Sequence, residues 1–148
     1  MTTIRKQIQV PTSIDEAFAY FADFATTAEW DPDIAEARRV DDGKLGIGAR
    51  FEVVADFNGR RLPLTYAITA FAPPTRVVLA GEGSTFSGAD EITLTPAAGG
   101  GTRITYEADI NLTGVGKLAQ PFMKGRFERM GDEAVRGLGR VLTGRRNS

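Results

Sequence analysis

The last third of the chain carries its longest helical pattern of apolar and polar positions. Over residues 115–142, apolar side chains recur every three or four residues, so they fall on one stripe of a helix. The stripe consists of Met123, Phe127, Met130, Ala134, Leu138 and Val141. Charged side chains occupy the opposite side. The pattern predicts a long amphipathic helix, which Pro121 begins or kinks.

The remainder of the chain alternates mostly with the period of two that is typical of strands. Turn signals separate the alternating segments, and the strongest of them, Asn58-Gly59, predicts a type I′ hairpin turn. Short strands joined by tight turns favour an antiparallel meander. The predicted strands cover residues 3–10, 34–40, 49–57, 62–71, 76–81, 86–95 and 102–110.

Two short helices are expected after the first strand. Ser13 and Glu16 match a capping box, which predicts a helix that begins at Ser13 and runs to about residue 23. Residues 25–29 form the second, which ends before Trp30-Asp31-Pro32. This segment has two interpretations, a lid over a cavity entrance or a hydrophobic plug between the short helices and the sheet.

This order of elements predicts a single α+β domain over residues 1–148. A curved antiparallel sheet of six or seven strands would wrap around the long C-terminal helix and bury one face against it. Six glycines lie in and just before that helix, where interior glycine is unfavourable by about 1 kcal/mol each. They indicate either close contact between helix and sheet or room for a ligand. The glycines are Gly114, Gly116, Gly125, Gly131, Gly137 and Gly139.

Composition excludes several classes of function. The chain has no cysteine and no histidine, which rules out Cys or His metal sites and the Ser-His-Asp and Cys-His nucleophile arrangements. A net charge of −1 and a pI near 5.5 argue against nucleic-acid binding. The longest charge-free run, residues 62–75, is too short to span a bilayer, and the N-terminus lacks an apolar signal-peptide core. We therefore expect a cytoplasmic protein without membrane insertion, metal or cofactor.

Five short segments, in this order and spacing, carry a resemblance that extends over essentially the full chain. They are residues 11–18, 24–32, 46–51, 71–76 and 101–106. The chain resembles the START-like, helix-grip superfamily (SRPBCC), within it the polyketide cyclase/dehydrase and lipid-transport group. The resemblance implies a deep, mostly apolar cavity between sheet and C-terminal helix. Relatives cyclise or aromatise polyketides, carry lipids, quinones or hormones, or act as co-chaperones. They share no catalytic motif, so no catalytic residue transfers to this sequence.

Strand alternation indicates which side chains face such a cavity. The expected wall is aromatic on the sheet side and rich in methionine on the helix side, which suits a flat or flexible apolar ligand. For each of these residues a purely structural place in the core is the competing interpretation. The candidate ligand-binding residues are Trp30, Phe51, Phe57, Tyr66, Phe86, Tyr106, Met123, Phe127 and Met130.

Asp90 is the strongest candidate for a catalytic residue. Alternation with Ile92 places it inward, where an apolar surrounding would raise its pKa and suit it to acid–base catalysis, with Tyr66 or Tyr106 polarising a carbonyl group. Alternatively, a bulge at residues 87–89 turns Asp90 to solvent, or a hydrogen bond gives it a structural role.

Three functions remain open. The first is binding or transport of a small hydrophobic molecule, lipid or polyketide-like, by a monomer or homodimer. The second is a polyketide cyclase, aromatase or dehydratase that uses Asp90, Tyr66 and Tyr106. The third is a co-chaperone-like interaction protein that uses the basic helix surface.

Overall fold

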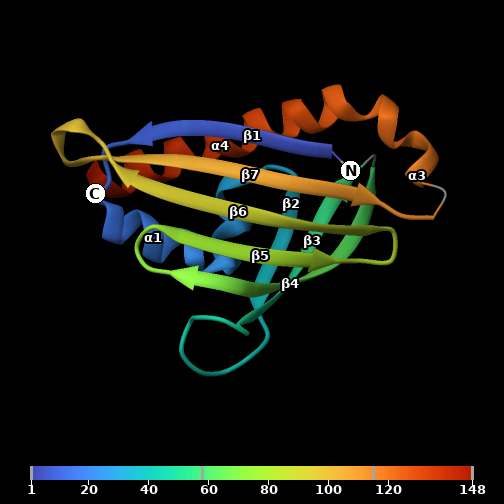
Figure 1. The fold of residues 1–148 in the computed structure, drawn as a ribbon, viewed down its shortest axis with the longest axis horizontal. Coiled ribbons are helices and arrows are strands. Elements are labelled where there is room, and N and C mark those ends of the chain that lie inside the picture. The colour runs from blue at the N-terminus through green and yellow to red at the C-terminus, as the bar shows by residue number, and fades with distance from the viewer. Residues whose placement is uncertain (1, 58, 115, 148) are drawn as a thin grey trace.

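A computed structural model describes residues 2–57, 59–114 and 116–147. Its centre is one seven-stranded antiparallel sheet with the strand order β1-β7-β6-β5-β4-β3-β2. Figure 1 shows β1, β7, β6, β5 and β4 side by side, while β3 and β2 cross behind them, so the sheet is strongly curved. The strands are β1 (Thr2–Val10), β2 (Ile34–Arg39), β3 (Arg50–Phe57), β4 (Arg60–Ala72), β5 (Arg76–Glu82), β6 (Phe86–Pro96) and β7 (Thr102–Leu112).

The predicted α+β helix-grip architecture is confirmed, with strand ends that differ from the expected ones by at most two residues. Neighbouring strands are consecutive in the chain except at one edge, where the first strand pairs with the last. The β5–β6 register is regular from Glu82↔Ser87 to Arg76↔Thr93. The predicted alternative of a bulge at residues 87–89 is therefore wrong. The type I′ turn cannot be assigned, because Asn58 lies outside the described residues, although Gly59 has the positive φ of 75° that such a turn needs.

The short helices follow β1 as predicted. Helix α1 (Ile14–Ala22) begins after Ser13, whose hydroxyl accepts the backbone N–H of Glu16 at 3.4 Å. A 3₁₀ turn, η1 (Phe24–Thr26), and α2 (Thr27–Trp30) take the place of the second predicted helix. Together they bury Trp30, which is 1% exposed and lies edge-on to the rings of Phe21 and Tyr106.

The C-terminal helical region is broken near Pro121. It consists of α3 (Gly116–Ala119), a 3₁₀ turn η3 (Gln120–Phe122) and α4 (Lys124–Asn147). The break expected at Pro121 is therefore confirmed. The expected start at residue 115 lies outside the described residues, and the expected end at residue 142 is wrong, because α4 continues to Asn147. The Gln120 side chain accepts the N–H of Leu112 at 2.9 Å and donates to the Ile110 carbonyl at 2.7 Å, which anchors the break to β7. Proline has no N–H to continue the helical bonding, so the chain turns here before α4 begins.

Three glycines let α4 approach its neighbours closely. A Cβ added to Gly131 would lie 2.8 Å from the Ile4 side chain, and one added to Gly139 would lie 2.5 Å from Ile8, both on β1. A Cβ on Gly137 would collide with the carbonyl oxygen of Trp30. Of the two interpretations of the helix glycines, close contact therefore holds at all three positions.

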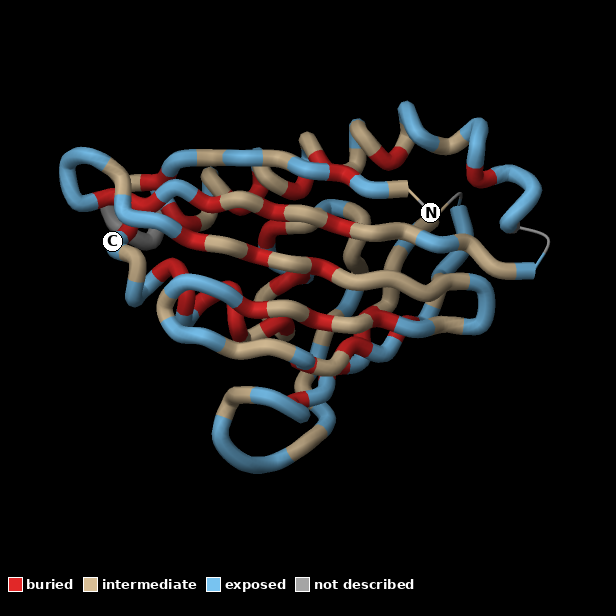
Figure 2. The backbone as a smooth tube through the Cα atoms, viewed as in Figure 1, coloured by how far each residue is buried: buried red, intermediate tan, exposed pale blue. Residues whose placement is uncertain are grey.

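The apolar core lies between the sheet and the helices. Figure 2 shows buried positions alternating with less buried ones along β7, β6 and β5, as expected for a sheet covered on one face. An ion pair cluster adds to the contact of β1 with α4, because Lys6 Nζ lies 2.6 Å from Glu128 and 2.9 Å from Asp132. No helix within the described ranges is long and apolar enough to cross a membrane.

Candidate functional site

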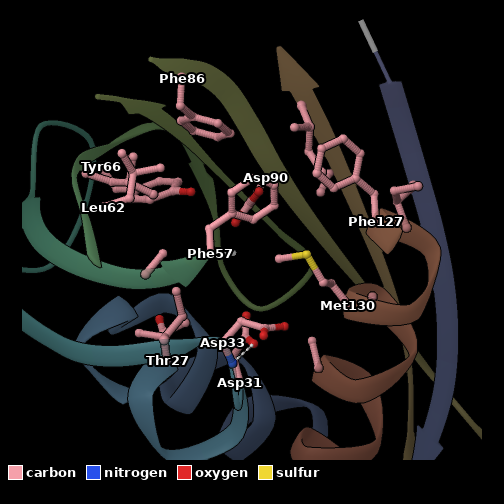
Figure 3. A pocket seen from close by; sticks show the side chains of 18 of the residues that line it. Thr27, Asp31, Asp33, Phe57, Leu62, Tyr66, Phe86, Asp90, Phe127 and Met130 are labelled. Carbon is pink, nitrogen blue, oxygen red and sulfur yellow. Dashed lines mark hydrogen bonds between the residues drawn. The ribbon is translucent and has the colours of Figure 1, made fainter. Parts of the chain in front are cut away.

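A cavity of about 130 Å³ lies between the concave face of the sheet and the N-terminal half of α4. Most of its wall is apolar, and its polar wall residues are two tyrosines, one threonine and three aspartates. Figure 3 shows aromatic rings around the space, with Met130 of α4 pointing into it. Its wall consists of Ile4, Phe24, Thr27, Asp31, Asp33, Ile34, Ala55, Phe57, Leu62, Leu64, Tyr66, Phe86, Asp90, Tyr106, Ala108, Ile110, Leu112, Phe127, Met130, Gly131 and Ala134.

At one end of the cavity, β3 and β7 end and β6 begins. The half-buried wall residues Phe57, Phe86 and Leu112 lie there, whereas Tyr66, further along β4, is buried. The ring of Phe57 stacks on that of Phe127 with a centroid distance of 6.1 Å and an interplanar angle of 23°. This stack joins the end of β3 to α4 in the cavity wall.

Seven of the predicted candidate residues line the cavity, and the structure thereby brings them together. They are Phe57, Tyr66, Phe86, Asp90, Tyr106, Phe127 and Met130. Three others do not reach it. Phe51 is buried against Phe24, Trp30 is buried between Phe21 and Tyr106, and Met123 lies half-buried before the start of α4. Of the two interpretations of the Trp30 segment, the plug describes the tryptophan and the lid does not.

Asp90 points inward and is 7% exposed. The Tyr106 hydroxyl donates a hydrogen bond to its Oδ2 at 2.9 Å. Burial raises the pKa of Asp90 to about 7, although the Tyr106 hydrogen bond acts in the opposite direction. Tyr66, also 7% exposed, lies over Gly81 with its ring, and its hydroxyl forms no hydrogen bond with any described residue. One carboxyl oxygen and one phenol therefore remain available to a ligand.

Two further carboxyl groups, from Asp31 and Asp33, reach the cavity from the connection between α2 and β2. Asp31 Oδ1 accepts the backbone N–H of Asp33 at 3.0 Å. Burial, together with the charges of Asp33, Asp90 and Glu133, raises the pKa of Asp31 to about 7, although the hydrogen bond from the Asp33 N–H acts in the opposite direction. In Figure 3 both aspartates lie across the cavity from Tyr66. Asp33 Oδ2 is buried without a hydrogen-bond partner among the described residues.

Sequence reasoning did not find Asp31 and Asp33, because they lie in a connection without periodicity. One signal was present. Asp31 ends a helix, where a carboxylate gains nothing from the helix dipole, and it adjoins a buried tryptophan. Within the described part of the chain, no group of three or more Asp or Glu side chains is placed to hold a metal ion. The polar side chains of the wall can form hydrogen bonds and transfer protons inside an apolar surrounding.

A comparison with protein-family models matches residues 1–143 to the family described as polyketide cyclase/dehydrase and lipid transport. The chain belongs to this polyketide cyclase/dehydrase and lipid-transport family. The match covers the whole fold, and it confirms the START-like resemblance that the sequence motifs carried. A comparison with curated proteins gave no significant match.

Solved structures with the same fold include proteins of different kinds. A protein from Thermus thermophilus is 15% identical, with a TM-score of 0.81 over 97% of this chain and 98% of its own. The Zhui aromatase/cyclase from a Streptomyces species is 11% identical, with a TM-score of 0.75 over 97% and 92%. A START superfamily protein from Mycobacterium smegmatis is 17% identical, with a TM-score of 0.70 over 97% and 95%. At these identities, the similarity of these structures to the present protein shows a common fold and nothing more.

Proposed function

We propose that this protein binds a small hydrophobic molecule in the cavity between its sheet and α4. The observation that carries the proposal is the cavity itself, with its largely apolar wall and a few polar groups at fixed places. A cavity of about 130 Å³ in an apolar core costs about 3 kcal/mol of stability relative to a close-packed core. Family membership supports the same class of function.

The size of the cavity limits the ligand. Pockets for drug-sized molecules usually measure about 300–1,000 Å³, whereas an engineered apolar cavity of about 150 Å³ in another protein binds benzene. The present cavity of about 130 Å³ therefore suits a single ring or one end of a longer chain. A larger lipid or polyketide-like ligand requires the Phe57–Phe127 stack to open.

Toluene is a suitable probe, because it has one ring and no polar group. We expect toluene to bind the wild-type protein, detected by isothermal titration calorimetry and by amide shifts around the cavity in nuclear magnetic resonance spectra. Ala108→Leu, which fills the cavity from β7, should weaken binding at least tenfold. The matched control is Ala80→Leu on β5, a half-buried position outside the cavity wall, which should bind toluene like the wild type. Absence of toluene binding to the wild type, or equal loss in both variants, would contradict the proposal.

A second candidate, acid–base catalysis on a carbonyl substrate, is favoured by one observation. Two aspartates whose pKa values burial raises to about 7, Asp31 and Asp90, line the same cavity as the unbonded Tyr66 hydroxyl. A base acts best when its pKa lies near the working pH. Asp90 would remove a proton from the carbon beside a carbonyl group, and Tyr66 would donate a hydrogen bond to the carbonyl oxygen.

The test follows hydrogen–deuterium exchange on cyclohexanone, a one-ring ketone, by nuclear magnetic resonance. The wild type should accelerate exchange at the carbon beside the carbonyl, and Asp90→Asn should abolish the acceleration while toluene still binds. Equal exchange with and without the protein would exclude this chemistry for the probe and leave the binding function unaffected.

A further inference from the structure

The charges around the cavity specify the kind of polar group that its ligand carries. The wall contains three aspartates, Asp31, Asp33 and Asp90, and none of the described wall residues is a lysine or an arginine. An apolar molecule with an anionic end would therefore bring its charge next to these carboxyl groups. A cationic end would instead lie next to negatively charged groups.

Further acidic side chains near these carboxyl groups add to the negative charge around the cavity. The charges that act on Asp31 are those of Asp33, Asp90 and Glu133 of α4, and the charge that acts on Asp90 is that of Asp109. All four are acidic. Asp33 differs, because Arg126 of α4 acts on it together with Glu133 and Asp56. The guanidinium of Arg126 lies over the ring of Phe57, the last residue of β3, at 5.1 Å from the ring centroid.

Acceptors inside the cavity are available to a donor group. Asp90 uses one oxygen for the Tyr106 hydroxyl, and Asp31 uses one for a backbone N–H, so each has a second oxygen. The hydroxyl of the buried Tyr66 has no hydrogen-bond partner among the described residues. An ammonium group carries three donors and no acceptor, so it can serve several of these oxygens at once.

We propose that the ligand is a small apolar molecule with a protonated amine at one end, held by Asp31 and Asp90, and that the cavity rejects carboxylates of the same size. This inference rests on the proposed binding function and names its ligand class. Hydrogen bonds between ions are shorter and about twice as strong as neutral ones. They act here inside an apolar wall, where screening by water is weak.

Four one-ring probes that differ only in their substituent separate this inference from the binding function. They are toluene, benzyl alcohol, benzylamine and benzoate, titrated calorimetrically at about pH 8 in about 0.15 M salt. This pH lies above the pKa of about 7 of Asp31 and Asp90, so both carboxyl groups are mainly ionised. Benzylamine should bind about tenfold more tightly than benzyl alcohol, since hydrogen bonds between ions are about twice as strong as neutral ones. Benzoate should bind at least about tenfold more weakly than the alcohol. Equal affinity for amine and alcohol, or tighter binding of benzoate than of benzylamine, would overturn the inference.

The same set of probes shows which proposal fails. If toluene and benzyl alcohol bind while benzylamine shows no advantage, the binding function stands and the amine preference is refuted. If none of the four binds, toluene included, both proposals are refuted. Because these comparisons use the wild-type protein, they do not depend on the folding of any variant.

Variants then test the residues. Asp90→Asn and Asp31→Asn should each reduce the ratio of benzylamine to benzyl alcohol affinity at least threefold. The matched control is Glu107→Gln, which removes the same charge from the neighbouring strand β7 at a position outside the cavity wall. Glu107 is not among the charges that act on Asp31 or Asp90. This control variant should keep the wild-type ratio. An unchanged ratio in both cavity variants, or an equal reduction in the control, would show that these carboxyl groups do not bind the amine.

Discussion

Replacing Asp90 by asparagine should remove a large part of the pH dependence of folding stability. Asp90 is 7% exposed, and burial raises the pKa of its carboxyl group from 3.8 to about 7. The asparagine amide has nearly the same shape, and its oxygen can still accept the hydrogen bond that the Tyr106 hydroxyl donates at 2.9 Å. The change therefore removes the titrating proton and leaves the packing nearly intact.

The direction in which folding stability changes with pH depends on which state, folded or unfolded, binds the proton more tightly. Because the pKa of Asp90 is higher in the folded than in the unfolded protein, the folded state holds the proton better. The wild type is therefore most stabilised by this group below about pH 4. It loses that stability as the pH rises through about 7. A rise in pKa from 3.8 to about 7 corresponds to about 4 kcal/mol, which is an upper limit because water can enter around a buried carboxylate.

Urea unfolding between pH 4.5 and 8.5 measures this effect. The free energy of unfolding of the wild type should fall across the range, and that of Asp90→Asn should fall less, by up to about 4 kcal/mol. Some dependence should remain in the variant, because burial also raises the pKa of Asp31 to about 7. Glu107→Gln, outside the cavity wall and not among the charges that act on Asp90, should follow the wild-type curve. Parallel curves for the wild type and Asp90→Asn would show that Asp90 does not titrate as a buried acid.

Two further predictions concern the helix and the cavity opening. Gly137→Ala should destabilise the protein by about 1–3 kcal/mol in urea unfolding, because its Cβ would collide with the Trp30 carbonyl oxygen. Gly125→Ala, with only Arg129 of its own helix nearby, should instead stabilise it by up to about 1 kcal/mol, and equal effects of the two changes would contradict the packing argument. Phe57→Ala removes the ring that stacks on Phe127, so the variant should bind naphthalene at least tenfold more tightly than the wild type does. Unchanged naphthalene affinity in calorimetry would show that the stack does not limit ligand size.

The sequence predicts the strands and the fold well because the sheet buries one face. Alternation along β6 placed Asp90 on the side of Ile92, and both are buried in the structure. The helix ends were less predictable. Apolar periodicity continues from residue 115 to 142, but the bonds of Gln120 to β7 and the missing N–H of Pro121 interrupt the helix before Lys124. Neither effect changes the hydrophobic pattern.

The cavity could be predicted only in part, because sharing a face of the sheet does not place two residues at the same point along it. Phe51 and Phe57 share a face of β3, yet only Phe57 reaches the cavity, since Phe51 packs against Phe24. That difference depends on where the short helices cover the curved sheet. Asp31 was missed for a related reason. Its orientation is set by the turn from α2 into β2, which has no sequence period.

The position of the cavity follows from how α4 meets the sheet. Toward the C-terminal half of α4, Gly137 and Gly139 bring the helix into close contact with Trp30 and Ile8. Toward the N-terminal half, bulky Phe127 faces the sheet instead, and the cavity lies there. The same geometry separates two properties of a ligand. The Phe57–Phe127 stack at the end of β3 limits its size, whereas the carboxyl groups in the cavity wall act on its polar end, so one property can change without the other.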